Sequence, residues 1–159
     1  MSGFTIREGR PDDRIHCIRF IDALQALEQT MAHDRRLDDR VGGEYYDVLI
    51  ERVRTREGRL YVAEAEGRPI GWIVAYTGTQ DLYIEPPLQK YGYVAELYVE
   101  PAWHGSGAGQ ALLAAAEAHL RTTGVKYMLI GVLEGNARAD AAYRKAGFHH
   151  YAHDLRKWF

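Results

Sequence analysis

The sequence contains a single cysteine and no long apolar run. With only Cys17 among its 159 residues, an internal disulfide is excluded and a reducing compartment is favoured. No apolar stretch approaches the roughly 18 residues that a membrane-spanning helix needs. The first residues also lack the basic and then apolar pattern of a signal peptide. We therefore expect a cytoplasmic protein without a membrane partner.

An excess of charge of either sign is also missing. The chain has 20 Lys and Arg against 22 Asp and Glu, a net charge of −2, and the two signs are interspersed. A general nucleic-acid binder would show a basic face, so we expect no nucleic-acid partner. The 47% hydrophobic content is that of a globular protein, and the length is sufficient for one core. We expect a single domain over residues 1–159.

Apolar spacing and turn residues divide the chain into strands and helices. Strands are predicted at 4–7, 60–66, 70–77, 93–99 and 126–133, and helices from about 13 to 31, at 44–56, from the glycine-rich loop to about 123, and at 136–146. Residues 33–43 and 80–90 are predicted loops, and the tail 148–159 is expected to add one or two strands. The order β-α-α-β-β-β-α-β-α-β predicts a mixed sheet with helices on both faces.

A glycine-rich loop lies at the centre of this plan. The strand at 93–99 stops before Pro101, and Gly105, Gly107 and Gly109 then alternate with other residues before an Ala- and Leu-rich helix. The first N–H groups of a helix lack intrahelical partners, and the helix dipole adds positive charge there. This junction therefore predicts a phosphate-binding site.

Three other interpretations of the loop are weaker. A P-loop would place Lys and then Ser or Thr after the last glycine, whereas Gly109 precedes Gln110 and Ala111. A dinucleotide-binding fingerprint needs one more residue between its glycines. Glu134 ends the following strand, as the acidic partner of that fingerprint would, but too few β-α units follow. A turn that serves only packing would not need three alternating glycines.

Two motifs resemble those of a known family. The run Val99-x-Pro101-x-Trp103-His104-Gly105-x-Gly107-Ala108-Gly109-x-Ala111-Leu112-Leu113 resembles motif A of the GNAT superfamily of N-acetyltransferases. Asn136, Ala139, Tyr143, Gly147 and Phe148 resemble its motif B, and the order of elements is similar from Thr5 onward. The resemblance implies an α/β (α+β) fold with a mixed, mostly antiparallel central sheet, and transfer of an acetyl group from acetyl-CoA to a primary amine.

The resemblance also implies which residues bind acetyl-CoA, as a co-substrate and without a metal. These are Leu97, Tyr98, Val99, His104, Gly105, Ser106, Gly107, Ala108, Gly109, Gln110, Asn136 and Tyr143. His104 stands where the family pattern has Arg or Gln, so we expect a weaker cation-to-phosphate contact but an intact backbone cradle. Asn136 would contact the pantetheine arm or cap its helix. The strand at 97–99 should separate from its neighbour and offer N–H groups to the thioester.

Two side chains are candidates for proton transfer. An alkyl amine has a pKa near 10.4, so a base must remove a proton before attack. Glu96 lies mid-strand, where carboxylates are uncommon, and matches the catalytic glutamate of many family members. Its alternative role is a salt bridge. Tyr143 matches the family's tyrosine acid for the leaving thiolate, and its alternative role is core packing.

The acceptor remains open among a protein lysine, a polyamine, an aminoglycoside and an amino acid. Carboxylates that could attract a cationic amine lie at Asp34, Asp38, Asp39, Glu44 and Glu85, and tyrosines that could wall its pocket at 83, 91, 93 and 98. A non-catalytic acyl-CoA-binding module of the same fold is the alternative function. The aromatic tail and the habit of the family suggest a homodimer.

Some residues that resemble functional groups are expected to be structural. His149, His150 and His153 have no cysteine or paired carboxylate beside them in the sequence, so we do not predict a metal site there. Cys17 lies on the apolar face of the first helix and is predicted to be a core residue.

Overall fold

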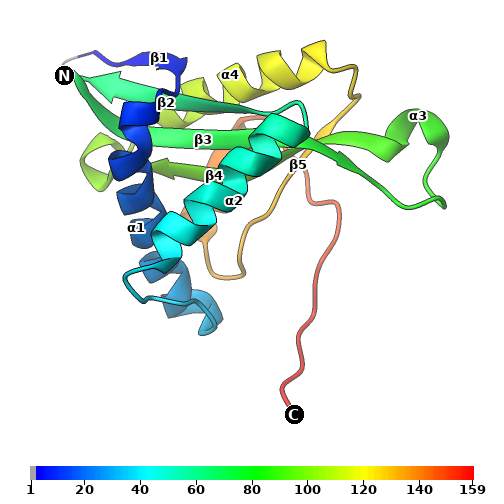
Figure 1. Cartoon of the computed structure of the whole chain (residues 1–159). Coiled ribbons are helices and arrows are strands. Elements are labelled where there is room, and N and C mark those ends of the chain that lie inside the picture. The colour runs from blue at the N-terminus through cyan, green and yellow to red at the C-terminus, as the bar shows by residue number, and fades with distance from the viewer. Residues whose placement is uncertain (1–2) are drawn as a thin grey trace.

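The computed structural model describes residues 3–159 as one mixed five-stranded sheet between two layers of helices (Figure 1). The strands are β1 (Thr5–Glu8), β2 (Arg59–Ala65), β3 (Arg68–Thr79), β4 (Lys90–Val99) and β5 (Met128–Ile130), and they lie in chain order. The helices are α1 (Arg14–Ala32), α2 (Val41–Thr55), α3 (Pro86–Gln89), α4 (Ala108–Thr122) and α5 (Ala137–Lys145), with short 3₁₀ turns at Pro11–Asp13 and Pro101–Trp103. The first four strands are antiparallel and β5 runs parallel to β4, which confirms the predicted fold class.

β3 is the central strand, and its side chains alternate between two cores. Trp72 and Val74 face one way and pack with α1 and α2, while Ile73 and Ala75 face the other way and pack with α4. Because both faces are covered, the strand is apolar along nearly its whole length. In Figure 1 the two N-terminal helices cross one face of the sheet and α4 covers the other. Among residues 3–159, no helix combines the length and apolar character needed to cross a bilayer.

α2 begins three residues earlier than predicted because its glycines pack against α1. We predicted that residues 33–43 form a loop, yet Val41 already starts the helix. A β-carbon at Gly42 would lie 2.9 Å from a methyl of Ile18 and 2.4 Å from a carboxylate oxygen of Asp22. The absent side chain lets α1 and α2 approach closely, so tertiary packing overrides the low helix propensity of glycine.

The C-terminal part of the chain has less strand than predicted. β5 covers only Met128–Ile130 rather than 126–133, and residues 149–159, all of which the structure describes, form no helix or strand. The expected tail strand is therefore a wrong prediction. Figure 1 shows the tail running away from the sheet. Two of its residues contact the rest of the protein: His150 pairs with Asp140 (2.6 Å), and Arg156 donates to the carbonyl of Ala32 at the end of α1 (2.8 Å) and pairs with Asp34 (2.5 Å).

One extra residue in β4 determines which way its middle points. Val74 of β3 pairs with Glu96, but the next residue, Ala75, pairs with Val94, so Ala95 is a β-bulge. Strict alternation would put Glu96 on the same face as Val94, in the core under α4. The bulge moves Glu96 to the opposite face, toward α1 and α2, because two consecutive side chains then share that face.

Close contact between β3 and the end of β4 gives a testable stability prediction. A β-carbon at Gly71 would lie 2.6 Å from the carbonyl oxygen of Tyr98 and 3.1 Å from the α-carbon of Val99. These are backbone atoms, so Gly71→Ala should destabilise the fold by about 1–3 kcal/mol. In a thermal melt we expect the midpoint to fall by at least about 2 °C.

The matched control is Gly43→Ala. Gly43 lies in the first turn of α2, and the atom nearest to a new β-carbon would be 3.7 Å away. The midpoint should not fall there, because alanine has a higher helix propensity than glycine and meets no close neighbour. Equal midpoints for the two variants would contradict the close strand contact.

Candidate active site

The strands β4 and β5 separate in the middle of β4. Their pairing ends at Val94 and Ile130, so the rest of β4 has no strand partner on that side within residues 3–159. On the other side, the N–H of Glu100 donates to the carbonyl of Ile70 in β3 (2.8 Å). Since polar groups alternate in direction along an antiparallel strand, those of Val99 and Leu97 point into the gap. The expected separation of this strand is therefore present.

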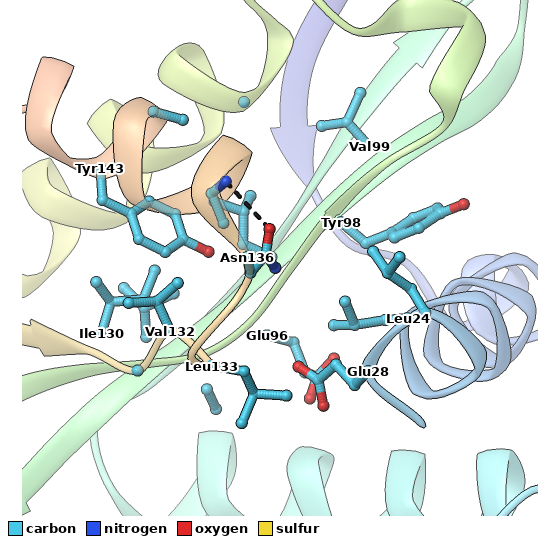
Figure 2. Close-up of a pocket in the computed structure, with 18 of the residues that line it drawn as sticks. Leu24, Glu28, Glu96, Tyr98, Val99, Ile130, Val132, Leu133, Asn136 and Tyr143 are labelled. Atoms are coloured by element: carbon cyan, nitrogen blue, oxygen red, sulfur yellow. Dashed lines mark hydrogen bonds between the residues drawn. The ribbon is translucent and has the colours of Figure 1, made fainter. Parts of the chain in front are cut away.

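The gap opens into a cleft of about 1150 Å³. Its walls come from β4, β5, α1, α2, α5 and the glycine-rich loop (Figure 2). Every site residue predicted from the sequence lines it: Glu96, Leu97, Tyr98, Val99, His104, Gly105, Ser106, Gly107, Ala108, Gly109, Gln110, Asn136 and Tyr143. The structure thus brings them together in one place, while their individual roles stay predictions.

The glycine-rich loop offers unpaired N–H groups to one end of this cleft. Within the described chain, the N–H groups of Gly105, Gly107, Gly109 and Gln110 have no protein partner, whereas the N–H of Ala108 donates to the hydroxyl of Ser106 (3.2 Å). Gly105 and Gly107 have φ of 79° and 91°, a left-handed conformation that favours glycine. The alternating glycines therefore coincide with free donors beside the N-terminus of α4, where the helix dipole adds positive charge.

Two side chains in this region make hydrogen bonds within the protein. The Nε2 atom of His104 lies 2.9 Å from the carbonyl oxygen of Val99 and ties the loop to the end of β4. The amide of Gln110 donates to the carbonyl of Ala142 (2.9 Å) and joins α4 to α5. Gln110 can therefore donate to a ligand in the cleft through its backbone N–H. The contact of His104 with Val99 fixes the loop against the end of β4, which forms part of the cleft wall.

Glu96 is a buried carboxyl group at the middle of the cleft. Only 5% of the residue is exposed, and its Oε2 atom has no hydrogen-bond partner within residues 3–159. Burial raises the pKa of Glu96 to about 8, and the negative charge of Glu28 adds to the rise. A hydrogen bond from Tyr45 and the charge of Arg35 act in the opposite direction. Glu96 is thus a group whose proton is exchangeable near neutral pH.

Tyr143 and Asn136 enter the cleft from the motif on α5. Figure 2 shows the Tyr143 hydroxyl directed into the cleft from the side opposite Glu28. Burial raises the pKa of Tyr143 to about 12, and the charges of Glu28 and Glu96 add to it, so the phenol keeps its proton. Its ring also packs edge-on against Phe148, so the predicted packing role is present as well. The carbonyl oxygen of the Asn136 side chain accepts from the N–H of Ala139 (3.2 Å), which is the predicted helix cap.

Glu28 is a cleft residue that we did not single out in the sequence. It comes from the last turns of α1, and Figure 2 shows its carboxylate beside that of Glu96. Arg35 holds Glu28 in place through its Nε atom (2.8 Å from Oε2). A signal was available, because Glu28 follows Leu24 by four residues and Ile21 by seven. It is therefore a charge on the apolar face of the helix.

The other acceptor candidates divide between the cleft and the surface. Glu44, Tyr93 and Tyr98 line the cleft. The remaining candidates, Asp34, Asp38, Asp39, Tyr83, Glu85 and Tyr91, are absent from the lining that the described residues form. The loop at 80–90 lies at the tip of the β3–β4 ribbon, away from the cleft, with α3 in it (Figure 1).

Cys17 and the C-terminal histidines lie outside the site. Cys17 is fully buried, and burial raises the pKa of its thiol to about 12, as suits a core residue. His150 pairs with Asp140 (2.6 Å) and its ring contacts that of His153. Within residues 3–159, no group of three His, Cys, Asp or Glu side chains is arranged to hold a metal ion.

The raised pKa of Glu96 predicts how stability depends on pH. The folded protein keeps a proton on Glu96 that the unfolded chain releases above pH 4.5. The contribution of Glu96 to the free energy of unfolding is therefore at its full value below pH 4.5. It is lost as the pH rises through about 8. Glu96→Gln should therefore gain stability relative to the wild type between pH 5 and pH 8.5, as measured by urea unfolding. A difference that stays constant over this range would contradict a buried carboxyl group.

The chain is similar to several curated acetyltransferases. It is 31% identical over 102 residues to the aminoglycoside N(6')-acetyltransferase type 1 of Stenotrophomonas maltophilia, which covers 63% of this chain and 65% of that protein. It is 33% identical over 106 residues to the mycothiol acetyltransferase of Geodermatophilus obscurus, over 61% of this chain and 34% of that protein. The matched region thus spans less than two thirds of either relative.

Solved structures share the fold over almost the whole chain. A GCN5-related N-acetyltransferase from Ralstonia eutropha JMP134 has a TM-score of 0.77 and 23% identity, and the match covers 98% of this chain and 99% of that one. The model of the acetyltransferase (GNAT) family matches residues 22–148, which include the cleft, the glycine-rich loop and both motifs. This match confirms the family predicted from the sequence: the chain belongs to the acetyltransferase (GNAT) family.

Proposed function

We propose that this protein transfers an acetyl group from acetyl-CoA to a primary amine of a small molecule or protein. The attack is direct, with Glu96 as the base and Tyr143 as the acid. The observation that carries the proposal is the placement of three features around one cleft: the free N–H groups of the loop, the unpaired edge of β4, and a buried carboxyl opposite a half-buried phenol.

The loop end of the cleft fits the pyrophosphate of CoA. Its free N–H groups at Gly105, Gly107, Gly109 and Gln110 can donate to phosphate oxygens, and the dipole of α4 favours their negative charge. Because these donors are backbone groups, replacement of the family's Arg or Gln by His104 leaves them in place. We therefore assign the phosphate site to the backbone.

The unpaired edge of β4 fits the pantetheine arm and the thioester. The N–H groups of Leu97 and Val99 point into the gap, where a carbonyl oxygen that gains negative charge could accept from them. The side-chain N–H groups of Asn136 are available for the same arm, since its carbonyl oxygen is used in the helix cap. Acetyl-CoA supplies the activated acetyl group, and the residues of β4 orient it.

Glu96 and Tyr143 are placed to move the protons. Glu96, with a pKa of about 8, can take a proton from the attacking amine, directly or through a water molecule, as the new C–N bond forms. Tyr143 keeps its proton at neutral pH and can donate it to the sulfur as the C–S bond breaks. The two groups face the cleft from different sides, as attack and departure at one carbonyl carbon require.

These roles predict the effect of two conservative substitutions. Glu96→Gln and Tyr143→Phe should each lower kcat by about 100-fold or more, while the KM for acetyl-CoA changes by less than about threefold, because each change removes one proton transfer. The measurement is release of free thiol with a panel of primary amines. Wild-type rates in both variants would remove the assigned roles. Binding of acetyl-CoA with no thiol release from the wild type would instead favour a non-catalytic acyl-CoA-binding module.

The backbone cradle predicts a specific loss of CoA binding in Gly107→Ala. Gly107 has φ of 91°, so alanine strains the loop whose N–H groups form the proposed phosphate site. The expected result is a Kd for CoA about tenfold higher than that of the wild type, measured by calorimetry. Gly124→Ala is the matched control, because Gly124 has φ of 85° at the other end of α4 and equally open surroundings. Equal CoA affinity in the two variants would contradict the cradle.

A further inference from the structure

Two carboxyl groups meet in the acceptor half of the cleft, one from each wall. Glu96 comes from β4 and Glu28 from α1, and Figure 2 shows their oxygens turned toward each other. The charge of Glu28 is among the causes that raise the pKa of Glu96. Burial, and second to it the repulsion between these like charges, keep a proton on Glu96 near neutral pH in the free protein. A cation placed between the two groups would remove that repulsion.

One oxygen of Glu96 also lacks a hydrogen-bond donor within residues 3–159. Its Oε2 atom is buried and has no hydrogen-bond partner within the described residues, although the group lines the cleft. A buried acceptor that is left unpaired has lost its hydrogen bonds to water without gaining any in the protein. A ligand that donates a hydrogen bond to Oε2 would restore one of them. The unpaired oxygen therefore points to a donor that arrives with the substrate.

Glu28 is held in place by an ion pair with Arg35 on the side away from Glu96. Arg35 bonds to Oε2 of Glu28 at 2.8 Å, and the side chain of Glu28 is 21% exposed. Arg35 also pairs with Asp34, and Asp34 pairs in turn with Arg156, so two arginines balance two carboxylates in this cluster. A further positive charge beside Glu28 would therefore be balanced by Glu96 once Glu96 has lost its proton.

The surroundings of this position are charged groups that already have partners, neutral phenols and apolar side chains. Arg36 and Glu44, which also line the cleft, pair with each other (3.0 Å). The charged and titratable groups that face Glu96 are Glu28 from α1, Arg35 from the following loop, Tyr45 from α2, Tyr93 from β4 and Tyr143 from α5. Leu24 and Leu133 lie beside the two carboxyl groups in Figure 2. A ligand that fits this position therefore has one cationic donor on an aliphatic stem.

We propose that Glu28 and Glu96 together form the ammonium site of the acceptor, and that Glu28 selects aliphatic amines in their cationic form. This inference rests on the proposed acetyl transfer and adds the charge state of its acceptor. The amine enters as R-NH₃⁺, and Glu96 releases its own proton to solvent and becomes a carboxylate. That carboxylate then takes one proton from the ammonium, so that neutral R-NH₂ attacks the thioester. As the C–S bond breaks, Tyr143 gives its proton to the sulfur, and the second proton that the nitrogen loses restores the Tyr143 phenol.

The test compares hexylamine with 1-hexanol, which has the same stem and no charge. Calorimetric titrations of the full chain at pH 7, with CoA present to prevent turnover, should show hexylamine binding at least tenfold tighter. Glu28→Gln should lose this preference. Glu51→Gln, an exposed carboxylate on α2 that pairs with Arg54, should retain it. Equal binding of the two probes to the wild type, or an unchanged preference in Glu28→Gln, would overturn the proposal.

Proton release gives a second readout that a purely structural role of Glu28 would not produce. Titrations in two buffers of different ionisation enthalpy should show up to about one proton released per hexylamine bound by the wild type. Hexanol should release none, and Glu96→Gln should release none with either probe. Hexylamine binding to the wild type without proton release would overturn the exchange at Glu96.

The two proposals fail separately. The amine preference and the proton release together with no thiol release from any amine would refute the acetyl transfer and support the ammonium site. Thiol release with a KM for the amine that is the same in the wild type and Glu28→Gln would refute the ammonium site alone.

Discussion

The arrangement of the site depends on how β4 is paired along its two edges. Next to β3, the extra residue Ala95 shifts the register by one position. Next to β5, the ladder stops at Val94. The first irregularity turns Glu96 toward α1 and α2, and the second leaves the N–H groups of Leu97 and Val99 without a strand partner among the described residues. One short segment therefore supplies a carboxyl on one of its faces and free donors on its edge.

Burial gives this segment its chemical character. The two helices over β4 exclude water from Glu96, so its proton is lost near pH 8 rather than below pH 5. Tyr143 is partly buried against the other core, next to α4, and this burial likewise raises the pKa of its phenol. A base and an acid with opposite tasks thus arise from two neighbouring low-dielectric environments, because burial favours the neutral form of both. The charge of Glu28 strengthens both shifts and couples them to whatever cation enters the cleft.

The sequence was sufficient for the fold class and for the family, and the candidate residues of β4 and of the two motifs all lie along one cleft. This success has a physical reason: the glycine spacing, the apolar strand and the Asn136 cap are local features that act within a few residues of each other. The sequence was not sufficient for the bulge at Ala95, since a one-residue shift arises from pairing with β3 and has no local signature. Glu28 was missed because it reaches Glu96 only through tertiary packing of α1.

The predicted tail strand failed for a related reason. A strand forms only where an edge is available in the right register, and residues 149–159 lie instead away from the sheet, with Arg156 bound near the end of α1. α2 shows the opposite case, in which the close approach at Gly42 extends a helix through two glycines. In both cases contacts between distant segments override the local preference of the residues.

Amide hydrogen exchange along β4, measured by NMR with and without CoA, tests the account most directly. The backbone N–H of Tyr98 points toward β3, so it should be protected from exchange both with and without CoA. Leu97 and Val99 should exchange quickly in the free protein and become at least tenfold slower when CoA is bound, because their N–H groups would then be covered by the pantetheine arm. Fast exchange at Leu97 and Val99 in the presence of saturating CoA would contradict the assignment of this strand edge as the acyl-CoA site.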